Sequence, residues 1–370
     1  MTTAPSAPKS AVVLGTGLIG TSVALALREA GTEVWLSDTD QVNARLAADL
    51  GAGRLLGYGE RLSEPADVVV LAMPPVAVAP SLADAQRRGL ARCYTDVASV
   101  KQLPLRAAAE LGCDLSAYVP GHPMSGRERS GPAAARADLF AGRPWIICPT
   151  SQTSSEAVDI VTGLIAACGG AASEMPAAEH DRCVALVSHV PHLLAVSMAA
   201  RCAEADPQTL ALAGQGLRDV VRIAASDAGL WTEILTANAV PAREILLAVA
   251  EQLTCAADVL ADLAGGNEDS AKRLTTLLEA GREGVARIPG KHGGAAPDYA
   301  VVQVVLGDQP GELARLFAAA GVAGVNIEDV RIEHSPGLPV GVVELFVRPE
   351  AASALSSGLA AGGWPVASPP

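Results

Sequence analysis

The sequence predicts an α/β domain with a parallel sheet at residues 10–176, an all-α domain at residues 177–287 and a small α+β domain at residues 299–370. Two changes of pattern mark these boundaries. Short apolar runs typical of buried strands alternate with helical patterns up to about residue 176, and only helical periodicity follows. A stretch rich in glycine and proline at residues 286–298 then indicates a linker before a segment of alternating strands.

Composition excludes several classes of partner. The chain has 370 residues and a formal net charge of −13, and it has no lysine and arginine run suited to a phosphate backbone, so nucleic acid is not expected. The first ten residues lack the apolar core of a secretory signal, and prolines interrupt the longest apolar runs, so no membrane span is expected. Seven cysteines stand singly without a CxxC pair, which favours reduced thiols in a cytoplasmic protein.

A glycine-rich turn follows the first predicted strand. Residues 10–14 form that apolar strand, and residues 21–29 continue as a helix. In this context the GxGxxG spacing between them is the dinucleotide-binding fingerprint of a Rossmann domain. The first glycine permits the turn, the second lets a pyrophosphate approach the backbone, and the third allows close packing. All six residues of the turn are therefore expected to bind the cofactor: Gly15, Thr16, Gly17, Leu18, Ile19 and Gly20.

The next strand, at residues 33–37, ends at Asp38, close to the spacing at which such domains place an acidic residue. A carboxylate there accepts hydrogen bonds from the adenosine ribose and repels a 2′-phosphate. We therefore expect NAD as the cofactor in preference to NADP. The alternative is that Asp38 only caps the following helix.

Two further strand ends are expected near the cofactor. Residues 67–75 form an apolar strand that two prolines end, which places Met73 and Pro74 beside the cofactor. Residues 94–101 repeat the arrangement. Here Ser99 either reaches the nicotinamide or the substrate or caps a helix, and Lys101 is expected to be solvated.

The segment at residues 121–128 contains one histidine, His122, on a predicted loop bounded by glycine and proline. Histidine has the side-chain pKa nearest neutrality, so His122 could accept a hydroxyl proton while a nicotinamide takes a hydride. Pro123 holds His122 in an extended conformation. Loops behind strands carry the chemistry of many α/β folds, which favours a catalytic base over a loop histidine bonded to its own backbone.

In the all-α domain, a proline interrupts a helical run at residues 188–192 and leaves His189 and His192 able to bind a ligand. Two histidines three positions apart could also form half of a metal site. Neither a carboxylate nor a cysteine stands at ligand spacing around them, so no metal is expected. Either histidine could instead be a satisfied core residue.

Two arginines, Arg218 and Arg222, are expected to share a helical face. Arginine grips a carboxylate with two parallel hydrogen bonds, so the pair could bind an acidic substrate. A surface salt-bridge network with Asp219 and Asp227 is an equally weighted alternative. Trp231 follows closely and could form a wall of the same pocket.

Taken in order, the glycine turn, the motif at residues 121–126, the motif at residues 188–192 and the motif at residues 218–224 resemble the prephenate/arogenate dehydrogenase family of tyrosine biosynthesis, over roughly residues 10–285. The resemblance implies NAD-dependent oxidation and decarboxylation of prephenate to 4-hydroxyphenylpyruvate. It implies that His122 accepts the proton of the ring 4-hydroxyl as the C4 hydride passes to NAD and CO2 leaves. It also implies a homodimer through the helical domain.

The resemblance further implies roles for individual residues. Ser99 orients His122 or the hydroxyl, Arg222 binds a substrate carboxylate, and His189 or His192 holds the substrate. Glu128 matches an acidic residue at the pocket mouth, and Arg218 stands where some relatives have lysine. These motifs do not separate prephenate, which ends in a keto acid, from arogenate, which ends in an amino acid.

The C-terminal segment has the predicted order β-α-β-β-α, with strands at residues 299–306, 325–333 and 340–347, helices at 311–320 and 350–361, and a further strand expected around Trp364. It resembles an ACT domain of ferredoxin-like α+β fold. That resemblance implies binding of an amino acid and feedback by L-tyrosine, with Asp308, Gly311 and Asn326 as effector residues. The alternative is a purely structural or dimerising module.

Two other functions are compatible with parts of the sequence. A β-hydroxyacid dehydrogenase is expected to use a lysine base in its helical domain, but Lys272 is the only lysine between Lys101 and Lys291 and lies far from the motifs. A non-catalytic sensor of amino acids that still binds NAD is the second alternative. The joint presence of His122, Ser99 and Arg222 argues against it.

Overall fold

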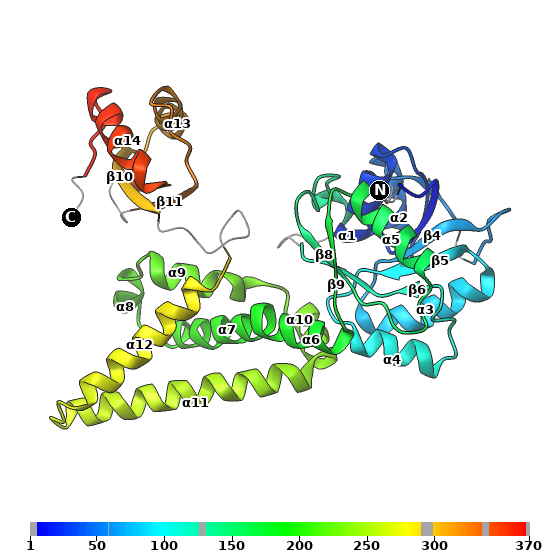
Figure 1. Cartoon of the computed structure of the whole chain (residues 1–370), viewed down its shortest axis with the longest axis horizontal. Helices are drawn as coiled ribbons and strands as arrows, with labels where there is room; N and C mark the ends of the chain where they lie inside the picture. Colours follow the sequence, from blue (N-terminus) through cyan, green and yellow to red (C-terminus); the bar gives the residue numbers. More distant parts are fainter. Residues whose placement is uncertain (1–5, 58, 126–130, 290–298, 335–339, 368–370) are drawn as a thin grey trace. The chain divides into compact units, whose positions relative to one another are not determined.

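The structure of the chain is a computed structural model that describes residues 6–57, 59–125, 131–289, 299–334 and 340–367. The chain forms two compact units, Met1–Ala250 and Glu251–Pro370 (Figure 1). The first unit holds the α/β domain and the first helices of the all-α region. The boundary between the units falls within the long helix α11 (Ala239–Ala264).

A six-stranded parallel sheet forms the centre of the α/β domain, in the order β3-β2-β1-β4-β5-β6. Apolar residues face both sides of it: Val13 packs into one core cluster and Val12 into another. A strand buried on both faces explains the continuous apolar run in its sequence. The predicted Rossmann-type sheet is confirmed. Its strands are β1 (Ser10–Leu14), β2 (Glu33–Ser37), β3 (Arg54–Leu55), β4 (Ala66–Leu71), β5 (Ala91–Asp96) and β6 (Tyr118–Val119), and its helices are α1 (Leu18–Glu29), α2 (Gln41–Asp49), α3 (Pro75–Arg88), α4 (Gln102–Glu110) and α5 (Ser155–Ala167).

A second, three-stranded sheet follows, and it corrects one prediction. It consists of β7 (Gly121–Pro123), β8 (Pro144–Ile147) and β9 (Ala171–Glu174). His122 was predicted on a loop, but it lies in β7, where it pairs with Ile146 of β8 in antiparallel register. The prediction was wrong because a three-residue strand has no periodicity of its own and forms only through its partner. The extended conformation expected before Pro123 suits this strand.

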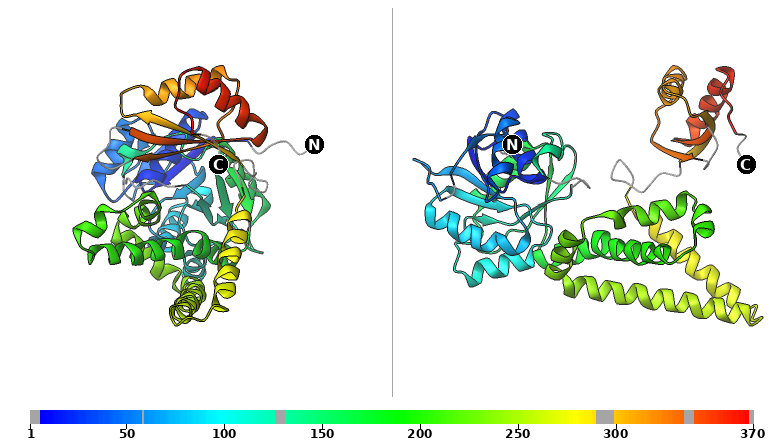
Figure 2. Two further views of the ribbon diagram at one scale, coloured as in Figure 1. Left: turned by 90° about the vertical axis from the view of Figure 1, so that its left-hand side faces the viewer. Right: turned by 180° about the vertical axis from the view of Figure 1, so that it is seen from behind.

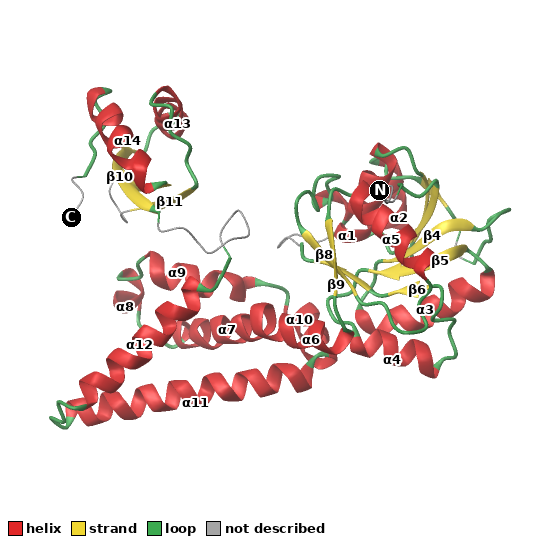
Figure 3. Cartoon of the chain, in the orientation of Figure 1, coloured by secondary structure: helices red, strands yellow, loops and turns green. Residues whose placement is uncertain are grey.

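The region between β9 and the next strand is helical, as predicted (Figure 3). The interruption expected around Pro191 takes the form of a π-helical turn just before the proline, and the helical run continues on both sides of it. A single helical segment, Ala177–Ala203, passes through α6 (Ala177–Val184), a π-helical turn (Ala185–His189) and α7 (Val190–Ala203). The π turn accommodates Pro191 in the first turn of α7, where its missing N–H breaks no ladder. The other helices are α8 (Pro207–Ala211), α9 (Gln215–Val221), α10 (Ala228–Ala237), α11 and α12 (Ser270–Ala286), and a 3-10 turn spans Arg222–Ala225.

The helix Ala177–Ala203 is the one described helix that is long and apolar enough, by length and composition alone, to cross a membrane. It also carries four titratable residues that are buried in the protein: His180, Asp181, His189 and His192. Burying such groups in lipid without partners is costly, and here three of them hydrogen-bond to protein groups. These hydrogen bonds are typical of a helix that packs against other parts of the protein.

The second unit ends in the predicted β-α-β-β-α order, with β10 (Ala300–Gly307), α13 (Glu312–Val322), β11 (Asp329–His334), β12 (Val340–Val347) and α14 (Pro349–Ala361). The antiparallel sheet has the order β10-β12-β11, and its two helices lie on the same face (Figure 2). Val302, Val304 and Leu306 of β10 are buried beneath them. The strand expected near Trp364 is reduced to a single antiparallel bridge between Val366 and Val304 of β10.

Candidate active site

The glycine turn fits a dinucleotide. Gly15 has a φ of +95°, and a Cβ there would lie 2.1 Å from the carbonyl oxygen of Ala72. A Cβ at Gly20 would lie 2.0 Å from the carbonyl oxygen of Gly15, whereas a Cβ at Gly17 would meet no atom within 4 Å. The first and third glycines are thus required by packing, and the second leaves open space before the N-terminus of α1. That combination suits a pyrophosphate approaching the backbone N–H groups.

Asp38 lies at the carboxyl end of β2 and binds the glycine turn. Its Oδ2 accepts hydrogen bonds from the Thr16 backbone N–H at 2.5 Å and from the Thr16 hydroxyl at 2.8 Å. The alternative that Asp38 caps the next helix is wrong, because Asp40 caps α2 by accepting from the N–H groups of Val42 and Asn43. Asp38 is thus held at the nucleotide end of the sheet, where it fits a ribose.

The predicted Met73 and Pro74 lie at the same edge of the sheet. They follow Ala72, the residue against which Gly15 packs. Met73 is half-buried against the core, and Pro74 is exposed at the N-cap of α3. Both therefore flank the nucleotide end, as the strand pattern predicts.

The imidazole of His122 is hydrogen-bonded to a second histidine. Its Nδ1 lies 2.8 Å from Nε2 of His180, and the two rings meet edge to face at 74°. Nδ1 of His180 lies 2.8 Å from Oδ1 of Asp181. His180 and Asp181 are both 1% exposed, so this chain of three side chains runs from the half-buried base into the interior.

Asp181 also joins two elements of the fold. Its Oδ1 accepts from the Lys101 backbone N–H at 2.8 Å, and its Oδ2 accepts from the Gln102 N–H at 2.9 Å. These donors stand at the N-terminus of α4, so the carboxylate ties α6 to that helix end. Burial alone would raise the pKa of Asp181, but hydrogen bonds from His180, Gln102 and Lys101 together lower it.

Lys101 is buried, which corrects the prediction of a solvated lysine. Its side chain is 0% exposed and its Nζ donates to the Asp96 carboxylate and to the Gly121 carbonyl. Asp96 also accepts from the Tyr118 hydroxyl at 2.6 Å, and burial together with Asp96 raises the pKa of Tyr118 well above its usual range. The sequence pattern did not reveal the burial of Lys101, because the partners of its ammonium group lie on two other elements: Asp96 at the end of β5 and Gly121 in β7.

Gly121 allows β7, the strand that carries His122, to pack closely against Asp96 at the end of β5. A Cβ at Gly121 would lie 2.8 Å from the Asp96 carbonyl oxygen and 3.0 Å from the Thr95 hydroxyl. Any larger residue would push β7 away from the end of β5. His122 is therefore placed by a glycine, a buried ion pair and the hydrogen bond to His180.

The environment lowers the pKa of three histidines of this region, His122, His189 and His192. Burial, with the positive charge of Lys101 and the neighbouring His180 and His189, holds the pKa of His122 well below its ordinary value. Burial lowers the pKa of His189 to about 4 and also lowers that of His192. A neutral imidazole at His122 can accept a proton at physiological pH.

Ser99 lies half-buried between β5 and α4. The alternative that it caps the helix is wrong, because Lys101 is the N-cap residue of α4. Within the described residues, no hydrogen bond joins Ser99 to His122. Its role toward the nicotinamide or the substrate stays a prediction.

The structure brings together three residues predicted to bind substrate. The rings of His192 and Trp231 stack with centroids 3.6 Å apart and planes within 2°, and His189 meets Trp231 edge-on at 6.1 Å. Nδ1 of His189 is 3.1 Å from the Asn238 amide, which also donates to the Asp181 carbonyl at 2.7 Å. In the described part of the structure, Nδ1 of the buried His192 has no hydrogen-bond partner.

Arg218 and Arg222 are both exposed. Arg218 is on α9, and the backbone N–H of Arg222, the C-cap residue of that helix, donates to the Arg218 carbonyl, so the two arginines lie one helical turn apart as predicted. Asp219 accepts from the Gln215 amide at 2.8 Å, and Asp227 caps α10 through the Leu230 N–H. The two acids weighed as salt-bridge partners thus have other local partners. Glu128 lies outside the described residues.

Several residues of the site escaped prediction: His180, Asp181, Asp96, Tyr118 and Asn238. A signal existed for the first two, since they lie within four consecutive titratable residues, 179–182, near the start of an otherwise apolar helical run. The others carry no distinctive spacing. No group of three or more His, Cys, Asp or Glu side chains in the described residues is arranged to hold a metal ion.

A dinucleotide-binding sheet with a buried histidine network at its carboxyl end, followed by a helical region, defines a two-domain NAD-dependent dehydrogenase. Two family models match the chain: the prephenate dehydrogenase nucleotide-binding domain at residues 23–174 and the prephenate dehydrogenase dimerization domain at residues 176–279. A protein named probable prephenate dehydrogenase from Streptomyces niveus is 40% identical over 96% of this chain and 99% of its own length. The chain belongs to the prephenate dehydrogenase family.

Other relatives agree with this assignment. The prephenate dehydrogenase of Bacillus subtilis is 27% identical over 87% of each chain. Among solved structures, the arogenate dehydrogenase of Synechocystis has a TM-score of 0.62 at 24% identity, covering 74% of this chain and 99% of that one. The prephenate dehydrogenase of Aquifex aeolicus, in complex with hydroxyphenyl propionate and NAD+, has a TM-score of 0.63 at 23% identity, covering 74% and 98%. These structures confirm the fold.

Proposed function

We propose that this protein catalyses the NAD-dependent oxidative decarboxylation of prephenate to 4-hydroxyphenylpyruvate in L-tyrosine biosynthesis. The observation that carries the proposal is the placement of His122: a neutral imidazole at the carboxyl end of β5, held by His180 and by the strand contacts of Gly121. The names of the relatives support the choice of substrate.

The residues of the chain supply the cofactor site, a base and a grip on the substrate. Gly15–Gly20 and Asp38 would hold NAD, which, when bound, takes the hydride from C4 of the substrate. His122 accepts the proton of the 4-hydroxyl as that carbon becomes a carbonyl. The bond to the ring carboxylate breaks, its electron pair passes through the ring to the C4 oxygen and CO2 leaves. The resulting phenolate takes back the proton held by His122, which completes 4-hydroxyphenylpyruvate and restores the neutral imidazole.

The helical region supplies the substrate contacts in this proposal. Arg222 binds a substrate carboxylate, with Arg218 beside it on the preceding helix, and Trp231 forms a wall of the pocket. His192 is the better candidate than His189 for a contact with substrate. His189 already faces Asn238, whereas His192 lies against Trp231 and its buried Nδ1 lacks a partner in the described structure.

The experiment that tests this proposal is NADH formation by the purified protein with prephenate and, separately, with arogenate, each with NAD and with NADP. Prephenate-dependent reduction of NAD is the expected result. A preference for arogenate would keep the mechanism and change the substrate, and efficient use of NADP would contradict the assignment of Asp38. Absence of turnover with either substrate would overturn the proposal and favour a sensor.

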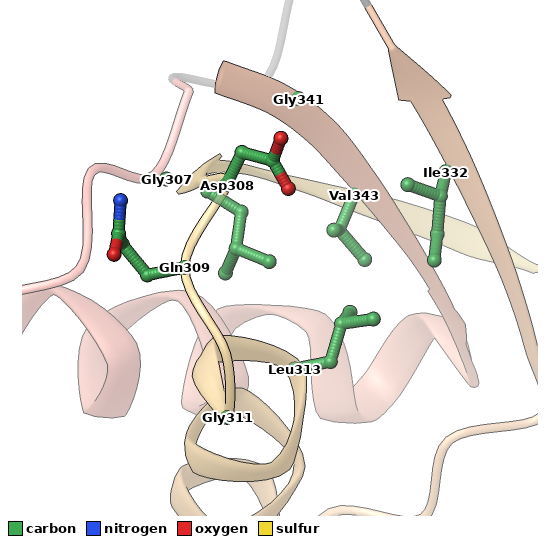
Figure 4. Close-up of a pocket in the computed structure, with 9 residues that line it drawn as sticks. Gly307, Asp308, Gln309, Gly311, Leu313, Ile332, Gly341 and Val343 are labelled. Carbon is green, nitrogen blue, oxygen red and sulfur yellow. The ribbon is translucent and has the colours of Figure 1, made fainter. Parts of the chain in front are cut away.

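For the C-terminal segment we propose an ACT-like regulatory role with L-tyrosine as effector. A cavity of about 130 Å³ lies between α13 and the sheet, and its lining includes Asp308, Gly311, Leu313 and Val343 (Figure 4). The Asp308 carboxylate points toward Val343, and the Gln309 amide points away. Asn326 is not in this lining, and its amide donates to Glu328 at 2.8 Å.

The regulatory proposal is tested by titrating L-tyrosine into the activity assay. A fall in rate that Asp308→Ala weakens is expected, with basal activity retained. A rate that does not change at any tyrosine concentration would favour the structural alternative.

We also propose a homodimer through the helical region. Large apolar side chains are exposed on several of its helices, including Leu186 (60%), Val240 (70%) and Leu247 (52%). Exposed apolar surface of this kind is typical of a protein interface. Sedimentation of the intact protein tests this, and a monomer at micromolar concentration would contradict it.

A further inference from the structure

We propose that Asp181 and His180 are positioning residues that hold His122 in one tautomer, with its Nδ1 protonated and its Nε2 free to accept the substrate proton. This inference rests on the proposed function in one respect, the role of His122 as the base. The three side chains and their bonds are otherwise independent of the substrate.

The first step of the argument concerns Asp181. Both of its oxygens accept backbone N–H groups, Oδ1 from Lys101 and Oδ2 from Gln102. A carboxylate with a donor at each oxygen is ionised and can only accept. Nδ1 of His180, 2.8 Å from Oδ1, must therefore carry its proton and donate it to the carboxylate.

The second step concerns the contact between the two histidines. A neutral imidazole carries one N–H, so a proton on Nδ1 of His180 leaves Nε2 as an acceptor. Nε2 lies 2.8 Å from Nδ1 of His122, and two nitrogens at that distance share one proton. That proton belongs to Nδ1 of His122. The lone pair of His122 is then on Nε2, the ring nitrogen not engaged by His180.

The third step concerns charge. When His122 takes up a proton, the new imidazolium keeps its Nδ1–H bond to His180, which in turn donates to anionic Asp181. Four other charged or titratable groups surround these three hydrogen-bonded side chains: Lys101 before α4, His189 in the π turn, Asp96 at the end of β5 and Tyr118 of β6. Lys101 is paired with Asp96, and Asp181 is the carboxylate aligned with the base. Asp181 thus offsets the charge that appears during proton transfer.

A purely structural role must be distinguished, because Asp181 also ties α6 to α4. Two substitutions of His180 separate the roles. In His180→Gln the side-chain amide oxygen can still accept from Nδ1 of His122, whereas in His180→Leu no acceptor remains. Glu179→Gln is a matched control, since it removes a charge from the exposed neighbour on the same helix turn.

The direct test is the tautomer of His122 in the wild-type protein, measured by long-range ¹H–¹⁵N correlation NMR at neutral pH. The signal is assigned by its loss in His122→Asn. The expected pattern is a protonated Nδ1 and an unprotonated Nε2. The opposite pattern would overturn the inference. The measurement needs no substrate, so it tests the tautomer of His122 even if the protein does not turn over prephenate.

The kinetic test compares the three variants with prephenate and NAD. His180→Leu is expected to lose about 10²-fold in kcat, because the base loses its fixed tautomer. The fall of kcat on the acidic side of the pH profile should move to lower pH and become less steep. His180→Gln is expected to stay within about tenfold of wild type, and Glu179→Gln to match it. KM for NAD should not change in any of them. A folded His180→Leu variant with wild-type kcat and pH profile would overturn the inference. If that variant does not fold, the NMR result and the rescue by His180→Gln decide the question.

Discussion

Two regions of the first unit use the same kinds of charged residue in opposite ways. At the strand ends, Lys101, Asp96 and Asp181 are buried, and each is held by hydrogen bonds to other parts of the chain. At α9 and the turn after it, Arg218 and Arg222 are exposed. Charged groups are thus desolvated and held in place in the first region, whereas in the second they remain in contact with solvent.

The energetic basis of the contrast is desolvation. A buried ion pair is costly to form, and removing one partner leaves the other charge uncompensated. An exposed arginine keeps its hydration and contributes little to stability until it binds an anion. The same substitution should therefore damage folding in one region and only binding in the other.

The largest effect is expected at the base that the buried region positions. His122→Asn should lower kcat by about 10²- to 10⁴-fold, because general-base catalysis is lost. The nucleotide site at Gly15–Gly20 does not include His122, so affinity for NAD should stay the same. Steady-state kinetics and NAD titration monitored by calorimetry check both statements, and wild-type turnover in the variant would remove His122 from the mechanism.

The next effect contrasts two lysines under one substitution. Lys101→Met should destabilise the first unit by about 3–5 kcal/mol, since Asp96 is left buried without its cation. Lys272→Met is the matched control: Lys272 is 87% exposed beside Asp269, and its loss should cost less than about 1 kcal/mol. Denaturant unfolding of both variants measures this. Equal losses would show that burial is not the source of the difference.

The exposed region should show the reverse pattern. Arg222→Ala should reduce kcat/KM for prephenate by roughly 10- to 100-fold, mainly through KM, the value expected for losing one hydrogen-bonded charge contact with a carboxylate. Its melting temperature should not change. Arg243→Ala, another exposed arginine of the helical region, is the control and should leave KM unaltered. A large stability loss without a change in KM would assign Arg222 to the fold.

The smallest effect concerns pH. Because burial and the positive charge of Lys101 hold the pKa of His122 well below its ordinary value, kcat should stay nearly constant between pH 6.5 and 8, with the base neutral throughout. An ordinary acidic limb near pH 6.5 would show that His122 is not buried in this way during turnover.

Stability should behave differently from turnover over the acidic range. His189 takes up its proton at about pH 4 in the folded chain and near pH 6.5 in the unfolded chain, so the unfolded state binds more protons between these values. Stability is complete above pH 6.5 and falls as the pH is lowered toward 4. Comparing the urea midpoints of wild type and His189→Gln at several pH values isolates this contribution.

The class of fold and the nucleotide end of the site are predictable from local sequence patterns. A buried strand, a GxGxxG turn and a helix are local patterns, so residues 10–29 and Asp38 are predictable from spacing alone, as is the strand and helix order of the C-terminal segment. The residue types of the catalytic and substrate-binding motifs are also visible in the sequence. Each of these signals lies within about two turns of structure or within one βα unit.

Which charged groups are buried, and which side chains contact one another, depends on residues that are far apart in the sequence. His122 and His180 are 58 positions apart, and the Lys101 backbone donates to a carboxylate 80 positions away. Burial depends on neighbours from other elements, so no local pattern separates the buried Lys101 from a solvated one, or a three-residue strand at His122 from a loop. The physical reason is that desolvation and hydrogen bonding depend on which strand ends and helices pack together, and local residue spacing does not specify that packing.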